Sequence, residues 1–168
     1  VAAWRMIRRG CRATLIHFHG YPFVSRSSQD KAIELARLLT RYQLHTRLFL
    51  VAFGEIQRQI TLSVPGPLRV VVYRRLMVRI AERIARDVDA RALENIAAIA
   101  AATTLPVLRP LVGMDKEEIT AEAIRLGTYA ISIVPDEDCC TLFTPRHPVT
   151  RARAAEIEAA ERTLPIDE

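Results

Sequence analysis

Apolar and polar residues follow two different periods along the chain, and segments of the two kinds take turns. Short, mostly apolar runs are typical of buried parallel strands, and they occur at 13–19, 47–53, 88–93 and 106–111. Apolar residues three or four positions apart predict one-sided helices, and they occur at 1–9, 30–42, 55–64, 68–87 and 115–127, with an alanine-rich helix after residue 94. This alternation predicts an α/β fold with a doubly wound, mostly parallel sheet and right-handed crossovers.

Glycine, proline and capping residues mark most of the expected element ends. Gly10 and Gly127 are expected to stop helices, and Asp115 followed by Glu118 forms a capping box at a helix start. The junction between Leu93 and Glu94 lacks such a signal, because a strand is expected to pass into a helix there with no turn residue between them.

Residues able to carry chemistry fall just after the expected strands or at helix starts. In parallel α/β sheets, ligands bind beyond the carboxyl ends of the strands. We therefore expect one composite site at this edge, with contributions from His17 and Phe18, from 53–55, from Lys116 and from the cysteine segment 135–145.

The cysteine segment places the adjacent thiols of Cys139 and Cys140 behind three acids and between Pro135 and Pro145. Prolines restrict the backbone, and acids resist burial without a partner, so the segment is expected to form a rigid loop that carries a reactive thiol. The alternative is that one thiol packs in the core as a small hydrophobic group. The acids are expected to raise a thiol pKa, so activation would have to come from a cation or a helix end.

Composition narrows the class of protein. A chain of 168 residues with 50% hydrophobic residues can bury the core of one domain. Three cysteines, two of them adjacent, do not form a disulfide framework, so we expect a reducing, cytoplasmic setting. No apolar run is long enough to span a membrane. Cys11 is expected in the core, and the scattered histidines and cysteines argue against a zinc site.

Positive charge in this chain comes almost entirely from arginine. The net charge is +5, and Lys31 and Lys116 are the only lysines. The arginines at 75, 79, 83 and 86 share one face of the expected helix 68–87. We interpret them as a solvated stripe, and an anion-binding edge is the alternative.

Motifs along nearly the whole chain resemble, in order, the catalytic domain of tRNA 4-thiouridine synthetases, the ThiI family of PP-loop ATP pyrophosphatases. The matching motifs are Val1-Ala2-Ala3, Arg8-Arg9-Gly10, His17-Phe18, Pro22-Phe23, Arg74-Arg75-Leu76-Met77-Val78-Arg79-Ile80, Leu108-Arg109-Pro110-Leu111, Met114-Asp115-Lys116, Gly127-Thr128-Tyr129, Ile131-Ser132-Ile133 and 138–145. The resemblance implies a sulfurtransferase domain over 1–150, followed by a helical tail over 151–168.

Two segments that this family has are missing from the sequence. The family's Ser-Gly-Gly-x-Asp-Ser phosphate loop precedes the residues that match Val1-Ala2-Ala3. A Gly-Gln-Val-Ala-Ser-Gln-Thr stretch precedes those that match Glu94-Asn95. The first residue is not Met and lies inside an expected helix, so we expect residues upstream of it. We also expect a segment to be missing between 93 and 94.

The resemblance assigns roles to six residues. His17 and Phe18 would contact the adenine nucleotide, and Arg74 its ribose or phosphate region. Lys116 would assist activation, with an ordinary surface lysine as the alternative. Cys139 would carry or attack sulfur, with Cys140 as its rival. No metal ligand is predicted.

The activity that the resemblance implies is ATP-dependent sulfur transfer to uridine 8 of tRNA. ATP with Mg²⁺ and tRNA would take part, a cysteine desulfurase would supply sulfur, and a sulfur-carrier protein of thiamine synthesis is a further partner. A homodimer is compatible with it. The alternatives are another PP-loop nucleotide-activating enzyme, or a nucleotide-binding module that has lost catalysis.

Overall fold

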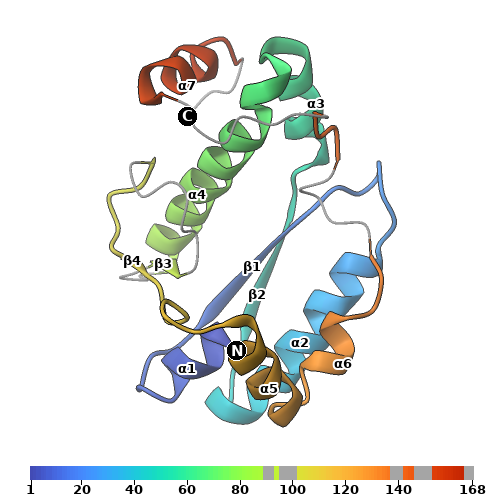
Figure 1. Ribbon diagram of the computed structural model, residues 1–168, viewed down its shortest axis with the longest axis vertical. Coiled ribbons are helices and arrows are strands. Elements are labelled where there is room, and N and C mark those ends of the chain that lie inside the picture. Colours follow the sequence, from blue (N-terminus) through green and yellow to red (C-terminus); the bar gives the residue numbers. More distant parts are fainter. Residues whose placement is uncertain (89–92, 95–101, 137–141, 146–152, 165–168) are drawn as a thin grey trace.

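The structure is a computed structural model that describes residues 1–88, 93–94, 102–136, 142–145 and 153–164. Helices precede and follow the first two strands as the residue pattern predicts (Figure 1), whereas most of the alanine-rich helix expected after residue 94 falls outside the described residues. The elements are α1 Ala2–Ile7, β1 Thr14–His19, α2 Ser27–Gln43, β2 Arg47–Ala52, α3 Gly54–Ser63, the 3₁₀ turn η1 Gly66–Leu68, α4 Arg69–Asp87, β3 Leu93–Glu94, β4 Val107–Leu108, α5 Lys116–Arg125, α6 Tyr129–Ser132 and α7 Ala154–Glu161.

All strand pairing among the described residues is parallel, which confirms the α/β class. β1 pairs with β2 in a register that runs from Thr14 opposite Arg47 to His19 opposite Ala52. β3 pairs with β4, with Leu93 opposite Val107. In the described part of the chain these are two separate pairs, and Figure 1 shows β3 and β4 to one side of β1 and β2.

Helices cover both faces of β1, because successive side chains of a strand point to opposite sides. Leu15 packs in a cluster with Trp4 of α1 and Leu39 of α2. Its neighbour Ile16 packs instead against Val78 and other residues of α4. Thus α1 and α2 lie on one face of β1, and α4 lies on the other.

The main core lies between α3, α4 and α7. Phe53, Ile60 and Val72 are fully buried there, and the rings of Phe53 and Tyr73 meet edge to face at 6.2 Å. Edge-to-face contacts of this kind stabilise beyond the area that they bury. This core fixes α3 and α4 beside the ends of β1 and β2.

Most arginines on the shared face of α4 form ion pairs with carboxylates. The expectation of a solvated stripe is wrong for Arg75, the first of them. Arg75 is buried, and its Nε donates to Glu161 of α7 at 2.5 Å. Arg79 donates to the same carboxylate at 3.0 Å. A carboxylate 86 residues away in the chain therefore neutralises the start of the stripe.

Some expected element ends differ from the structure. β4 is shorter than the expected 106–111, since Pro106 and Pro110 have no N–H to donate to a strand partner. Cys11 is exposed, which corrects its expected place in the core, because it lies in the connection before β1. The glycine stops are confirmed, as Gly10 and Gly127 adopt φ of +85° and +73°.

Glu82 attaches α4 to the segment that leads into β4. Its carboxylate is buried and accepts hydrogen bonds from the Thr104 hydroxyl at 2.5 Å and from Arg86 at 2.7 Å. These bonds, first of all the one from Thr104, lower the pKa of Glu82 from 4.5 to about 2. The charged form is therefore favoured in the folded protein.

The low pKa of Glu82 predicts an acid-dependent loss of stability. A carboxylate whose pKa is lower in the folded state stabilises the fold above its unfolded pKa, and this contribution disappears as pH falls towards the folded pKa. We expect Glu82→Gln to lower the free energy of unfolding by about 1.5–3 kcal/mol at pH 7, and the difference from wild type to shrink as pH falls from about 4.5 to about 2. Urea unfolding across this range measures it, and a difference independent of pH would contradict it.

Candidate active site at the carboxyl edge of the strands

The ends of β1 and β2 meet so closely that side chains are excluded between them. The backbone N–H of Phe53 donates to the carbonyl of His19 at 2.8 Å. A Cβ atom on Gly54 would lie 2.7 Å from the carbonyl oxygen of Gly20, so glycine is required there. Two connections therefore leave the sheet side by side at this edge.

His17 and Phe18 lie on β1 as expected, but their side chains are on opposite faces. The His17 Nε2 atom lies 3.3 Å from the hydroxyl of Ser28 in α2. The Phe18 ring packs edge to face on Phe53 at 5.6 Å, against the main core. The two residues therefore do not form one contact surface, and their contact with a nucleotide stays a prediction.

His19 is a further candidate that the sequence analysis did not select. It ends β1, it is 7% exposed, and its Nδ1 atom has no hydrogen-bond partner in the described part of the chain. Burial, with a smaller effect of the Arg26 guanidinium, lowers the pKa of His19, which favours the neutral ring. Its place at the last position of a strand, two residues after His17, was the available signal.

The segment before the cysteines is held to α2 by Lys31. The Lys31 ammonium lies 2.9 Å from a carboxylate oxygen of Asp136, and it donates to the carbonyls of Val134 at 2.5 Å and Ser132 at 3.4 Å. The Lys31 side chain is 15% exposed, so this contact is partly sheltered from water. One of the two lysines thus attaches this flank of the cysteine segment.

The segment after the cysteines lies against the strand ends. A Cβ atom on Gly20 would lie 3.1 Å from the Leu142 side chain, and Gln57 of α3 donates to the Leu142 carbonyl at 3.4 Å. The Phe143 ring contacts Phe23 at 5.9 Å. Figure 1 shows 142–145 beside α3. Cys139 and Cys140 themselves lie outside the described residues.

Lys116 and Arg74 are exposed, and the contacts found among the described residues do not join either to His17. Lys116 is the first residue of α5, after the capping box that the sequence predicted. The Asp115 carboxylate accepts from the Glu118 N–H at 2.8 Å, and the Glu118 carboxylate accepts from the Asp115 N–H at 2.9 Å. Arg74 lies on α4 next to the buried Arg75.

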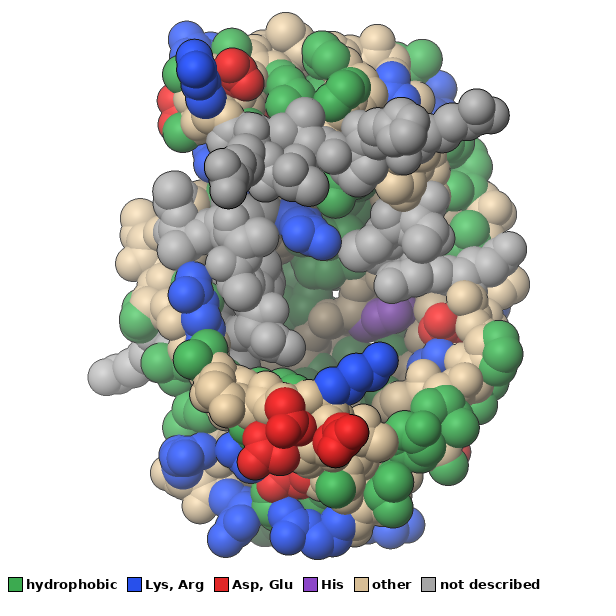
Figure 2. Space-filling model, in the orientation of Figure 1, with side chains coloured by type: hydrophobic (Ala, Val, Ile, Leu, Met, Phe, Trp, Pro, Cys, Tyr) green, Lys and Arg blue, Asp and Glu red, His purple; other side chains and the backbone are tan. Residues whose placement is uncertain are grey.

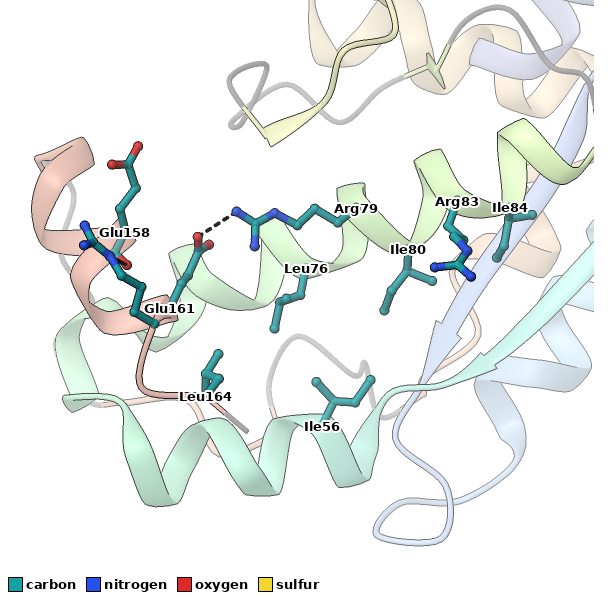
Figure 3. A pocket seen from close by; sticks show the side chains of 10 residues that line it. Ile56, Leu76, Arg79, Ile80, Arg83, Ile84, Glu158, Glu161 and Leu164 are labelled. Carbon is teal, nitrogen blue, oxygen red and sulfur yellow. Dashed lines mark hydrogen bonds and ion pairs between the residues drawn. The ribbon is translucent and has the colours of Figure 1, made fainter. Parts of the chain in front are cut away.

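A cavity of about 790 Å³ lies between α3, α4 and α7 (Figure 3). Ile56, Leu76 and Ile80 are among the apolar residues that line it, and the Arg79–Glu161 ion pair lies at one end. None of the six predicted site residues is among the described residues that line it. Figure 2 shows a hollow in the middle of one face, with a histidine on its wall and Lys or Arg at its edge.

Two features are absent from the described part of the chain. No group of three His, Cys, Asp or Glu side chains there is placed to hold a metal ion. Within the same residues, no helix is both long and apolar enough to cross a membrane.

Parallel strands with polar residues at their carboxyl edge are the arrangement in which α/β domains bind their ligands. The family described as "Thiamine biosynthesis protein (ThiI)" matches residues 1–166. The chain belongs to this family.

Similar proteins agree with this assignment. The chain is 52% identical to a "Probable tRNA sulfurtransferase" of Thermus thermophilus and 42% identical to one of Moorella thermoacetica, over all of this chain in both cases. It covers 45% and 47% of those proteins, so it spans about half of their length. A solved structure described as a 4-thiouridine synthetase–RNA complex with bound ATP matches 97% of this chain and 46% of its own, with 34% identity and a TM-score of 0.87.

Proposed function

We propose that this chain is the catalytic part of an ATP-dependent tRNA sulfurtransferase that makes 4-thiouridine at position 8. The observation that carries the proposal is the attachment of both flanks of the cysteine segment beside the ends of β1 and β2. In the sequence, Cys139 and Cys140 stand between these two attached flanks. The names of the similar proteins support the substrate and the bound nucleotide.

Strand topology supports a place for the phosphate loop. α1 and α2 cover the same face of β1, and parallel crossovers are right-handed. A strand leading into α1 would therefore lie on the side of β1 that is opposite β2. That edge of β1 has no partner among the described strands. We place the family's phosphate loop at the end of such a strand, directly before α1.

This arrangement would also create a switch point in the sheet. The connection after β1 runs over one face through α2, whereas α4 returns the chain to β3 over the other face. Ligands of open α/β sheets bind where neighbouring connections diverge in this way. Backbone N–H groups at the start of α1 would then face the leaving pyrophosphate. Glu122 would help to place Lys116 near this position, because both residues belong to α5 and the Glu122 carboxylate accepts a hydrogen bond from Nε of Arg5 in α1 at 2.7 Å.

The proposed reaction has three steps. The O4 oxygen of the uridine attacks the α-phosphorus of ATP and releases pyrophosphate, so that C4 carries AMP as a leaving group. A persulfide sulfur on Cys139, or on its rival Cys140, then attacks C4 and displaces AMP, which leaves that sulfur bonded to both C4 and the cysteine. A second thiol then attacks the cysteine sulfur, so that the S–S bond breaks, a disulfide forms and the sulfur stays on C4 as 4-thiouridine. Lys116 would offset charge that develops on the phosphates. Lys31 neutralises Asp136, one of the acids expected to raise the thiol pKa.

Several finer expectations belong to this proposal. Mg²⁺ would be held mainly by phosphate oxygens and water, because Mg²⁺ keeps several waters when it binds nucleotides. A cysteine desulfurase would supply sulfur, a sulfur carrier would extend the activity to thiamine synthesis, and the protein would form a homodimer. The alignment to the Thermus thermophilus protein spans 182 residues and includes all 168 residues of this chain, which supports a missing internal segment. The motif resemblance puts that segment between 93 and 94.

Restoration of 4-thiouridine tests the proposal. We expect the full-length protein to restore it in a strain that lacks the modification, and Lys116→Met to lower the rate by roughly 100-fold or more. Arg125→Met is the matched control, since it removes a cation from the other end of α5. Mass spectrometry of digested tRNA measures the product. If the wild-type protein binds ATP but forms no thiouridine, the result would favour the alternative function, a nucleotide-binding module that has lost catalysis.

A further inference from the structure

We propose that Tyr21, Phe23, Phe143 and Arg26 form a stacking surface for an RNA base that is extruded next to the cysteine segment. We call these four residues the aromatic rim. The inference rests on the proposed function and adds to it the residues that would hold the substrate base.

The rim gathers large apolar side chains at the surface, where they are costly unless they bind something. Tyr21, Phe23 and Phe143 are 40%, 43% and 37% exposed. Five aromatic side chains are exposed in the described part of the chain, and these are three of them. Single exposed apolar residues are ordinary, but a cluster rimmed by polar groups marks a binding surface.

Two separate connections supply the rim, and both lie at the carboxyl edge. Tyr21 and Phe23 belong to the turn after β1, which the Phe23 N–H closes by donating to the Gly20 carbonyl at 2.9 Å. Phe143 follows directly after Leu142, the residue that contacts Gly20. The rim therefore joins the strand end to the flank of the cysteine segment.

The rings are fixed in place while their faces stay available. Phe23 and Phe143 meet at an interplanar angle of 68°, so the ring that presents its edge keeps both faces clear of its partner. The Phe23 ring also packs close to the backbone of Gly54, since a Cβ atom on Gly54 would lie 2.7 Å from this ring. Phe143 holds φ at +57°, a strained conformation for a residue with a side chain, and such strain gathers at functional positions.

Arginine adds charge and a second kind of stacking partner. The Arg26 guanidinium lies over the Tyr21 ring at 4.6 Å from its centroid, and both residues are exposed. Extruded RNA bases stack on aromatic rings and on guanidinium planes, and arginine also attracts the adjoining phosphates. An enzyme that modifies a base must take it out of the helical stack, so it needs such a surface near its reactive group.

The test compares RNA and ATP affinity in variants of the full-length protein. We expect Tyr21→Leu and Phe143→Leu each to weaken the Kd for a tRNA transcript by roughly 5-fold to 100-fold, with the Kd for ATP unchanged. Tyr42→Leu is the control, because Tyr42 is 45% exposed on α2 outside the rim. Weaker ATP binding with unchanged RNA binding would mean that the rim holds adenine, and it would overturn the proposal, as would no change in either.

A second measurement uses the wild-type protein, so it does not depend on how the variants fold. A transcript with 5-iodouridine at position 8 is irradiated in complex with the protein, and the adduct is mapped by mass spectrometry. We expect the adduct on Tyr21, Phe23 or Phe143, and an adduct confined to other residues would overturn the rim. Thiouridine formation is measured separately. If the wild-type protein forms no thiouridine, the proposed function is wrong. If it forms thiouridine normally but the adducts lie on other residues, only the proposal of the aromatic rim is wrong.

Discussion

Full-length protein with Cys139→Ala and Cys140→Ala is expected to leave tRNA without 4-thiouridine, with a loss of activity of roughly 1,000-fold or more. The reason is that the persulfide sulfur has no other carrier at the carboxyl edge in the proposed reaction, and a thiolate is the reactive form of cysteine. Mass spectrometry of tRNA nucleosides in a strain that lacks the modification measures the effect.

Cys11 provides the matched control for this experiment, because it is exposed and lies before β1. We expect Cys11→Ala to keep the thiouridine level of wild type. The single variants then decide between the neighbours: by the family resemblance, Cys139→Ala is expected to lose activity and Cys140→Ala to keep it. Full activity of the double variant would remove the cysteine segment from the mechanism.

Glu161→Ala is expected to lower the free energy of unfolding by about 3–5 kcal/mol, which for a domain of this size lowers Tm by roughly 10 °C. Glu161 accepts from Arg75 and Arg79 together, and Arg75 is 6% exposed. Removal of the carboxylate would leave the Arg75 guanidinium buried without its partner. Thermal unfolding followed by circular dichroism measures the shift.

Two further variants separate the buried charge from the rest of α7. Glu158→Ala changes an exposed carboxylate on the same helix, and we expect it to change Tm very little. Arg75→Met combined with Glu161→Leu replaces the pair by apolar groups, and it should recover much of the lost stability. Equal losses from Glu158→Ala and Glu161→Ala would show that the buried pair has no special role.

Residue patterns alone were enough for much of the architecture. The alternation of apolar runs with one-sided helices predicted the parallel α/β class, and the Asp115–Glu118 capping box and the glycine stops at Gly10 and Gly127 were confirmed. These features depend on neighbours within about four positions, so local sequence specifies them. The ordered motifs led to the family, which the comparisons confirmed.

The contacts that build the site came from packing between distant segments. The pairing of Arg75 with Glu161 spans 86 residues, and the bond from Lys31 to Val134 spans 103. The separation of His17 from Phe18 depends on which helix covers each face of β1. Residue periodicity reports whether a side chain is covered, but it carries no information about which distant residue covers it. For that reason the attachment of the cysteine segment and the aromatic rim emerged only in the folded chain.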